Sequence, residues 1–381
     1  MKTKKILFIE GAISFGGSTV ELQNIIDNLD KHRYQFMVAC LYCGEHVTVL
    51  KNQITNIEIL DSKHFENWRF LKVTFIRLYH FIRIYLIIKR HHIDIIHFNN
   101  FVYYPGISAA KLLCIPCVCH LRSLPTDYKA RRKRVTFITK FFSQFVDHFI
   151  AVSNAVKQEY IELGFNSEKI SVIGTGISIN DIRRKANVKN LRSEFKISDD
   201  EFIIGTVARL SWEKGIVHLV DSMPYILRER ENVKCFIVGG GPLEDELKEK
   251  ISSLSLNRNI ILTGKMINPY YLLSGFDVFI LPSLREGRSV SIMEAMGLGI
   301  PVIATKVGGN VELVEQGVDG ILIESANADS IVKAVLSLIN NKDLRRKMSS
   351  NASKKAEREF SIKDKIVQIE EVYKSVCQKS A

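Results

Sequence analysis

Short apolar runs alternate with longer amphipathic segments along most of the chain, and this alternation predicts its secondary structure. In the first half, seven apolar runs have the length of buried strands. They are Lys5–Glu10, Phe36–Leu41, Ile57–Leu60, Ile93–Phe98, Pro116–His120, Asp147–Val152 and Ile170–Ile173. Helical patterns separate them, for example from Ser18 and from Ser153. Helices between buried strands indicate parallel pairing with right-handed crossovers.

The same alternation restarts near residue 201. Six further strands are predicted: Glu201–Ala208, Val233–Val238, Asn259–Leu262, Val278–Leu281, Pro301–Ala304 and Gly320–Ile323. We therefore predict an α/β fold of two doubly wound, Rossmann-like domains that face each other across a cleft. The expected divisions are an N-terminal domain, a polar linker, a C-terminal domain and a C-terminal helix that can pack back on the first domain. Their bounds are 1–178, 179–200, 201–360 and 361–381.

Length and charge agree with this division and suggest a partner. The 381 residues are enough for two full cores, and 46% hydrophobic against 25% charged residues is a globular composition. Residues 1–180 contain 23 Lys and Arg against 14 Asp and Glu, so they carry most of the net charge of +12. A basic domain favours an anionic partner such as a membrane surface or a phosphate-bearing lipid. Nucleic acid is not expected, because no aromatic binding platform is evident.

Two basic segments lie in this first half. In Arg69–Arg90, five basic positions fall within one arc of a helix, and the remaining circumference is apolar; they are Arg69, Lys72, Arg77, His80 and Arg83. Such a helix can lie on an anionic membrane, or it can pack its apolar face on the sheet and show its basic face to water. The second segment is the cluster Arg131, Arg132, Lys133 and Arg134. It can hold a lipid-linked pyrophosphate, or it can be a solvated loop and helix start.

The seven cysteines include two C-x-x-C pairs, Cys40 with Cys43 and Cys114 with Cys117. Such pairs can form a zinc site or can be buried free thiols, and free thiols are the preferred interpretation because no Gly-rich knuckle surrounds the pairs. The chain starts directly on a strand pattern without a signal-peptide pattern. We therefore expect a cytoplasmic, reducing location, with peripheral attachment to the inner face of the cell membrane left open.

The strongest chemical signal is the segment Leu281–Thr305. Glu286 follows a strand, Gly287 allows close backbone approach to a ligand, and Glu294 lies on the helix that begins near Ser289. Carboxylates accept hydrogen bonds from sugar and ribose hydroxyls, and the N–H groups at the helix start can hold phosphate. The simpler interpretation is two acids favoured by the helix dipole.

This segment resembles the E-x7-E signature of the retaining family 4 glycosyltransferases, which have the GT-B fold. Other segments resemble that family in its order along nearly the whole chain. They are Gly16-Gly17, Asp94–Asn100, Pro116–Ser123, Ala151–Lys157, Gly205–Gly215, Phe236–Leu247 and Pro301–Ile323. The resemblance implies an acceptor-side N-terminal domain and a C-terminal domain that binds a nucleotide-sugar.

The resemblance also implies roles for particular residues. Arg209 and Lys214 would clamp the donor diphosphate in place of a metal ion, which agrees with the absence of a D-x-D motif from the sequence; no metal or cofactor is expected. Glu286 would position the donor sugar and would not act as a nucleophile, and His120 would contact a sugar hydroxyl. The expected donor-binding residues are Gly16, Gly17, Arg209, Lys214, Gly287, Arg288, Ser289, Val290, Ser291 and Glu294. The expected acceptor or membrane side comprises Arg122, Arg131, Arg132, Lys133 and Arg134.

The predicted activity is therefore metal-independent, retaining transfer from a UDP-sugar to an acceptor in surface polysaccharide, capsule or lipopolysaccharide synthesis. The run Gly287-Arg288-Ser289-Val290 departs from the Gly-Phe-Gly-like run common in the family, which bears on the sugar accepted. Three alternatives remain: a non-catalytic nucleotide-binding scaffold, another GT-B enzyme such as an epimerase, and a dinucleotide-dependent oxidoreductase. The last lacks a G-x-G-x-x-G after the first strand.

Overall fold

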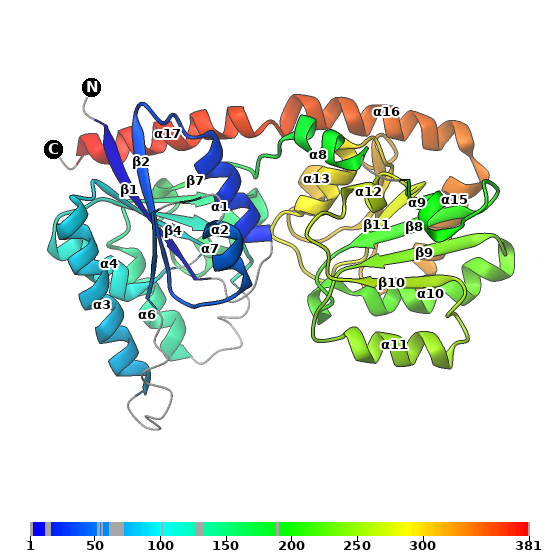
Figure 1. The fold of residues 1–381 in the computed structure, drawn as a ribbon, viewed down its shortest axis with the longest axis horizontal. Helices are drawn as coiled ribbons and strands as arrows, with labels where there is room; N and C mark the ends of the chain where they lie inside the picture. The colour runs from blue at the N-terminus through cyan, green and yellow to red at the C-terminus, as the bar shows by residue number, and fades with distance from the viewer. Residues whose placement is uncertain are drawn as a thin grey trace. The chain divides into compact units, whose positions relative to one another are not determined.

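The computed structural model describes residues 3–11, 17–51, 54, 56–60, 72–100, 102–125, 133–187 and 190–379. The chain forms two compact units (Figure 1). Unit 1 comprises Met1–Gly176 and Ile362–Ala381, and unit 2 comprises Ile177–Ser361.

Unit 1 is built on a seven-stranded parallel sheet with the strand order β3-β2-β1-β4-β5-β6-β7. The strands are β1 Lys4–Glu10, β2 Tyr34–Cys40, β3 Ile57–Ile59, β4 Ile95–Asn99, β5 Cys117–Leu121, β6 His148–Ala151 and β7 Ile170–Val172. All seven predicted strands are confirmed, with ends that shift by at most two residues. Their apolar side chains form buried clusters on both faces of the sheet, as continuous apolar runs require.

The helices of unit 1 are α1 Gly17–Asn28, α2 Glu45–Lys51, α3 Lys72–His91, α4 Tyr104–Leu112, α6 Lys133–Ser143, α7 Asn154–Glu162 and α17 Ile362–Lys379. Ser153 caps α7 by accepting a hydrogen bond from the backbone N–H of Val156, so the helix begins where the sequence predicts. The C-terminal helix α17 buries Ile366, Ile369 and Tyr373 against the first sheet. Helix α17 therefore lies within unit 1.

Unit 2 has a six-stranded parallel sheet with the order β10-β9-β8-β11-β12-β13. Its strands are β8 Phe202–Val207, β9 Val233–Val238, β10 Ile260–Gly264, β11 Val278–Leu281, β12 Val302–Thr305 and β13 Gly320–Ile323, which confirms the six predicted ones. Its helices are α8 Ile179–Ala186, α9 Leu191–Phe195, α10 Ile216–Glu229, α11 Glu244–Ser253, α12 Tyr270–Leu273, α13 Val290–Gly297, α14 Asn310–Leu313, α15 Ala328–Asn340 and α16 Lys342–Glu359, with a 3₁₀ turn at Trp212–Lys214.

The segment predicted as a linker, 179–200, differs from the prediction because it contains α8 and α9 and belongs to unit 2. Ile182 and Leu191 are 4% and 1% exposed and lie in the second core. Buried apolar side chains, Ile197 among them, dock this otherwise polar segment on the second core, which sequence composition alone does not reveal.

Each sheet has a point where the strand order reverses. In unit 1 the reversal lies between β1 and β4, and in unit 2 it lies between β8 and β11. Ligands of open α/β sheets bind outside the carboxyl ends of the strands at such points. We therefore expect a ligand site among the residues that follow these four strands.

Helix α3 corrects the expectation for the basic segment. Its buried side is formed by His80, Ile84, Ile87 and Ile88, so His80 does not belong to an exposed basic face. Burial of His80 is tolerated because its ring bonds the Leu60 carbonyl at 2.8 Å and also the Tyr103 hydroxyl. The exposed side carries an apolar stripe, which consists of Leu78, Ile82 and Leu86 at 52%, 46% and 53% exposure. Arg69 lies outside the described residues, and none of the described helices combines the length and hydropathy needed to cross a membrane.

The cysteines of the two C-x-x-C pairs do not share an environment. Cys40 and Cys117 are buried, whereas Cys43 and Cys114 are exposed. A shared metal would need both thiols of a pair on one side, and no group of three or more ligand residues occurs among the described residues.

Candidate functional site

The reversal point of the second sheet brings together two of the predicted residues. Lys214 ends the 3₁₀ turn after β8, and Glu286 lies in the loop between β11 and α13. The Lys214 Nζ atom is 2.6 Å from Glu286 Oε2. The two side chains are 23% and 9% exposed, so the pair is partly shielded from water. A cation and an acid next to a helix start can meet a diphosphate and a sugar hydroxyl in the same place.

The loop that carries Glu286 is held from three sides. Ser283 Oγ donates to Glu286 Oε2 at 3.2 Å, and Thr305 Oγ1 at the end of β12 donates to the Ser283 carbonyl at 2.6 Å. The Gly309 N–H donates to the Glu286 carbonyl, and the Leu284 N–H donates to the Glu213 carbonyl beside Lys214. These bonds fix the acid relative to the lysine before any ligand arrives, which is the property that a binding site needs.

A glycine makes the close approach of the two loops possible. Gly215 has φ +61°, and a Cβ atom there would lie 2.2 Å from the Pro282 carbonyl oxygen. Another residue would therefore be strained in its backbone and would collide with the strand-end loop. Lys214, the preceding residue, takes its position from this turn.

The start of α13 follows Glu286 directly. Ser289 caps the helix, its Oγ accepting from the Ile292 N–H at 3.3 Å, and Val290 and Ser291 form the first turn. Arg288 lies 3.9 Å from Glu312 of α14 and is 10% exposed, so its cation already faces an acid. The predicted Gly287, Arg288, Ser289, Val290 and Ser291 thus lie around one helix N-terminus, whose N–H groups and dipole favour an anion.

Glu294 occupies the buried inner side of α13 and is 8% exposed. The Tyr270 hydroxyl of α12 donates to its Oε1 at 3.0 Å. Burial raises the pKa of Glu294 to about 7, against smaller lowering effects of the Tyr270 hydrogen bond and of the charge on Lys185. A buried carboxyl with such a pKa can change its charge when a ligand binds.

Arg209 also belongs to this edge of the sheet, since it follows β8 directly. It is exposed, and it forms no ion pair with any residue in the described part of unit 2. Its guanidinium is therefore available to an anion. The structure places Arg209, Lys214, Glu286 and the start of α13 on loops that follow the neighbouring strands β8 and β11.

The reversal point of the first sheet carries a buried polar network that the sequence did not predict. Asn99, which ends β4, donates from Nδ2 to Glu10 Oε2 and to the Ser18 carbonyl, and its Oδ1 accepts from Arg122 Nε at 2.8 Å. Arg122 Nη1 forms an ion pair with Glu21 of α1. Glu10 and Ser18 flank residues 11–17, so one amide ties both ends of this connection.

This network changes the role expected for Arg122. Its side chain is 5% exposed and its charge is compensated within the domain by Glu21, so an acceptor phosphate would have to displace an internal partner. A buried cation without such a partner would be strongly destabilising, which explains why the acid on α1 accompanies it.

His120 lies beneath the same edge, on β5. It is 1% exposed, and its ring stacks on His97 with centroids 5.4 Å apart. The His97 Nδ1 atom is 2.6 Å from the hydroxyl of Tyr373 on α17. Burial, with the charge of Arg122 adding to it, lowers the pKa of His97 to about 3 and that of His120 well below its ordinary value. Both rings are therefore neutral at pH 7, and neither ring nitrogen of His120 is bonded by a described residue.

The structure does not describe the side chains of some predicted site residues. Gly16, Arg131 and Arg132 lie outside the described residues, and Lys133 and Arg134 begin α6 without described side chains. Gly17 begins α1, is exposed, and a Cβ atom there would meet nothing within 4 Å. Packing inside unit 1 therefore does not require a glycine at position 17.

Sequence reasoning did not single out the contacting residues Glu10, Glu21, His97, Asn99, Tyr270 and Tyr373. The only available signal was the polar ending of the apolar run IIHFN for Asn99. Tyr270 and Tyr373 lie far along the chain from their partners, and no spacing rule connects them.

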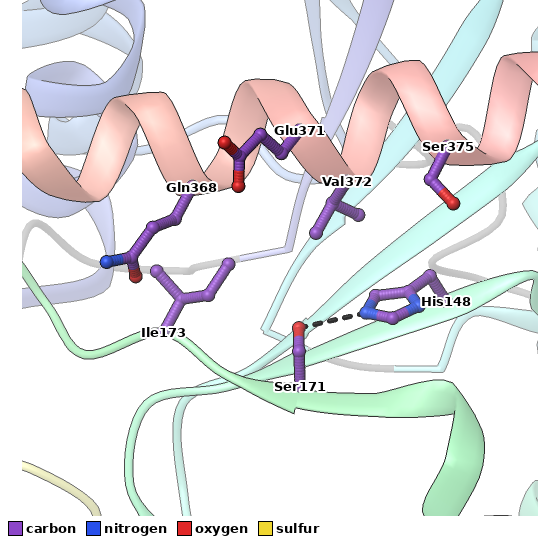
Figure 2. Close-up of a pocket in the computed structure, with 7 residues that line it drawn as sticks. All are labelled: His148, Ser171, Ile173, Gln368, Glu371, Val372 and Ser375. Carbon is purple, nitrogen blue, oxygen red and sulfur yellow. Dashed lines mark hydrogen bonds between the residues drawn. The ribbon is translucent and has the colours of Figure 1, made fainter.

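A separate hollow of about 320 Å³ lies in unit 1 between α17, the edge strand β7 and its neighbour β6. Figure 2 shows Gln368 and Glu371 on the helix opposite His148 and Ser171 on the strands. The His148 Nε2 atom bonds Ser171 Oγ at 2.9 Å. None of the predicted donor or acceptor residues that the structure describes lines this hollow, so it is separate from the candidate site.

Two family models match the chain in succession. Residues 15–181 match the model described as Glycosyltransferase Family 4, and residues 187–355 match Glycosyl transferases group 1. The described part of unit 2 that carries Arg209, Lys214, Glu286 and Glu294 lies within the second match.

The chain is also similar to individual glycosyltransferases. The capsular polysaccharide biosynthesis glycosyltransferase CapM of Staphylococcus aureus is 30% identical over 236 residues, which cover 61% of this chain and 62% of CapM. The chain thus spans less than two thirds of CapM. The Escherichia coli UDP-Gal:alpha-D-GlcNAc-diphosphoundecaprenol alpha-1,3-galactosyltransferase is 29% identical over 302 residues, 77% of this chain and 78% of that enzyme. The crystal structure of Anabaena Alr3699/HepE in complex with UDP superposes with a TM-score of 0.82 at 25% identity, covering 97% of this chain and 100% of that one.

Proposed function

Because the chain belongs to the family 4 glycosyltransferases, we propose that it transfers a sugar from a UDP-sugar to an acceptor. In this proposal the configuration at the anomeric carbon is retained and no metal ion is needed. The observation that carries the proposal is the contact of Lys214 with Glu286 at the reversal point of the second sheet, beside the start of α13. UDP is bound by the similar protein HepE, which supports the choice of nucleotide.

The donor diphosphate needs positive charge as it departs, because the breaking glycosidic bond transfers an electron pair to it. Lys214, the exposed Arg209 and the N–H groups of Val290 and Ser291 can supply this stabilisation without a metal. Lys214 is held against Glu286 in the structure, so phosphate and carboxylate would share the ammonium group. Glu286 would then accept a hydrogen bond from a hydroxyl of the donor sugar and fix its orientation.

Retention follows in this proposal from attack on the face that the diphosphate leaves. The acceptor oxygen forms the new bond to the anomeric carbon, the bond to the diphosphate breaks, and the departing phosphate oxygen takes the acceptor proton. Glu286 lies against Lys214, which suits a positioning role better than a nucleophilic one that would place it on the far face of the sugar. His120, neutral and without a described partner for its ring nitrogens, would contact a sugar hydroxyl from unit 1.

We propose an acceptor from surface polysaccharide, capsule or lipopolysaccharide synthesis, because CapM is named for capsular polysaccharide biosynthesis and the galactosyltransferase for a diphosphoundecaprenol-linked sugar. A lipid-linked acceptor would bring the enzyme to a membrane, and α3 offers a surface for it. Its exposed Leu78, Ile82 and Leu86 lie on the same helix as the exposed cations Lys89 and Arg90. Apolar side chains that enter the headgroup region beside cations are the pattern of an interfacial helix on anionic lipid.

The nucleotide proposal is tested by the thermal stability of the purified protein with UDP, GDP, ADP, CMP and NAD in turn. A ligand at 100 times its dissociation constant stabilises the folded state by about 2.7 kcal/mol. Stabilisation by UDP, with turnover of a UDP-sugar, supports the transferase. Binding without turnover would favour a non-catalytic scaffold, and stabilisation by NAD alone would favour an oxidoreductase.

The membrane proposal is tested by sedimentation with vesicles of neutral lipid and vesicles that contain anionic lipid. The wild type should bind the anionic vesicles, and Ile82→Glu should weaken this binding. Val367→Glu is the matched control, since Val367 is a 57% exposed aliphatic residue on α17. Equal binding of both variants would contradict a membrane role for α3.

A further inference from the structure

We propose that Tyr270 is a positioning residue for nucleotide binding, because its hydroxyl holds one oxygen of Glu294 and leaves the other oxygen to accept from a ribose hydroxyl. This inference rests on the proposed function, in which unit 2 binds the nucleotide.

The geometry around Glu294 leads to this role. Tyr270 Oη donates to Oε1 at 3.0 Å, and no described residue donates to Oε2. Glu294 is buried on the helix whose N-terminus would meet the diphosphate, so its carboxylate lies one to two helical turns beyond the phosphate position. A carboxylate held at that depth through Oε1 leaves Oε2 to accept from an approaching group.

Tyr270 is itself held in place. It is the first residue of the short helix α12, and its backbone N–H bonds the Asn268 side chain. Its ring faces Lys185 of α8, whose Nζ atom is 5.9 Å from the ring centroid. Burial, and next the charge of Glu294, raise the pKa of Tyr270, so its hydroxyl keeps its proton and remains a donor.

The charges around Glu294 are few. Among the described residues, α13 contributes no other charged side chain, and β11 and β12 contribute none. Helix α8 contributes Lys185, Asp181 and Arg183, and α16 contributes Glu357, which pairs with Arg183 at 2.8 Å. The tyrosine hydrogen bond is therefore one of only two lowering influences on the pKa of Glu294, the other being Lys185.

Protonation of Glu294 makes the stability of the folded protein depend on pH. Burial raises the pKa of Glu294 to about 7, so the folded protein keeps a proton that the unfolded chain releases above its ordinary pKa of 4.5. The contribution of Glu294 to stability therefore falls as pH rises from about 4.5 to about 7 and is constant above. Without the Tyr270 hydroxyl the pKa rises further, so this fall continues above pH 7.

The experiment compares wild type, Tyr270→Phe, Glu294→Gln and the double variant by thermal unfolding between pH 5 and pH 9. Tyr271→Phe is the matched control, since its hydroxyl bonds the neighbouring acid Glu194 at 3.4 Å in an exposed position. The stability deficit of Tyr270→Phe should be larger at pH 8 than at pH 6, and this difference should vanish in the Glu294→Gln background. Tyr271→Phe should show no such dependence.

The second measurement is the affinity for UDP-glucose, whose diphosphate diester does not titrate near pH 7, and for its 2′,3′-dideoxyribose analogue. At pH 8, Tyr270→Phe should weaken UDP-glucose binding about fivefold and leave the binding of the analogue unchanged. If wild type binds UDP-glucose and Tyr270→Phe binds it equally well, the role of Tyr270 is refuted and the donor proposal stands. If wild type binds neither UDP-glucose nor UDP, the donor proposal fails and the inference fails with it.

Discussion

Replacement of Glu286 by alanine separates the chemistry of the proposed site from its folding. The substitution removes the carboxylate that accepts from Lys214 Nζ at 2.6 Å and from Ser283 Oγ at 3.2 Å. Because Lys214 is 23% exposed, its ammonium can regain water when it loses its partner. We expect a stability cost of about 1 kcal/mol, which for a unit of this size lowers the melting temperature by roughly 2–4 °C.

The effect on catalysis should be much larger. A hydrogen bond from a sugar hydroxyl to a charged acceptor contributes about 1.5–3 kcal/mol, a factor of roughly 10 to 150 in rate. The released Lys214 would also lose its fixed direction toward the diphosphate, and the loss of one such stabilising group costs about 10²–10³-fold. We therefore expect kcat/KM for sugar transfer to fall at least ~100-fold.

The assay is steady-state transfer together with thermal unfolding of the same preparations. Glu324→Ala is the matched control, since it breaks a Lys–Glu pair of 3.0 Å in the same unit whose side chains are 49% and 68% exposed. It should change neither quantity. Activity of Glu286→Ala within about threefold of wild type would refute the positioning role. A melting temperature lowered by much more than about 4 °C would mean that the activity loss reflects unfolding.

Three further outcomes follow from the structure. Gly215→Ala should lower both the stability and kcat/KM, because its Cβ atom would lie 2.2 Å from the Pro282 carbonyl oxygen. The control is Gly317→Ala, which is also at positive φ but has nothing within 4 Å of its Cβ position, so it measures the backbone cost alone. Equal effects of the two substitutions would contradict the proposed clash. Arg122→Met should lower the free energy of unfolding, measured with denaturant, by about 3–5 kcal/mol, because it leaves Glu21 buried without its cation. A decrease below about 1 kcal/mol would refute the importance of this ion pair. EDTA should leave the transfer rate unchanged, whereas inhibition reversed by Mg²⁺ or Mn²⁺ would contradict the metal-free clamp.

The amino-acid sequence by itself determined the fold class and the position of every strand in the two sheets. Strand runs such as Val233–Val238 and Val278–Leu281 were predicted to the residue, because strands buried on both faces are continuous apolar runs with polar flanks. It also placed the candidate acids and cations on loops after strands, since parallel strands direct all such loops to one edge.

Only the tertiary structure decided which side chains meet. The contacts of Lys214 with Glu286, of Tyr270 with Glu294 and of Tyr373 with His97 join residues 72, 24 and 276 positions apart. Hydrogen bonding and burial depend on distances that sequence spacing does not encode beyond a few residues. The same reason explains α3, where hydrogen bonds to Leu60 and Tyr103 accompany the burial of His80, while Arg77 of the predicted basic face and an apolar stripe are both exposed.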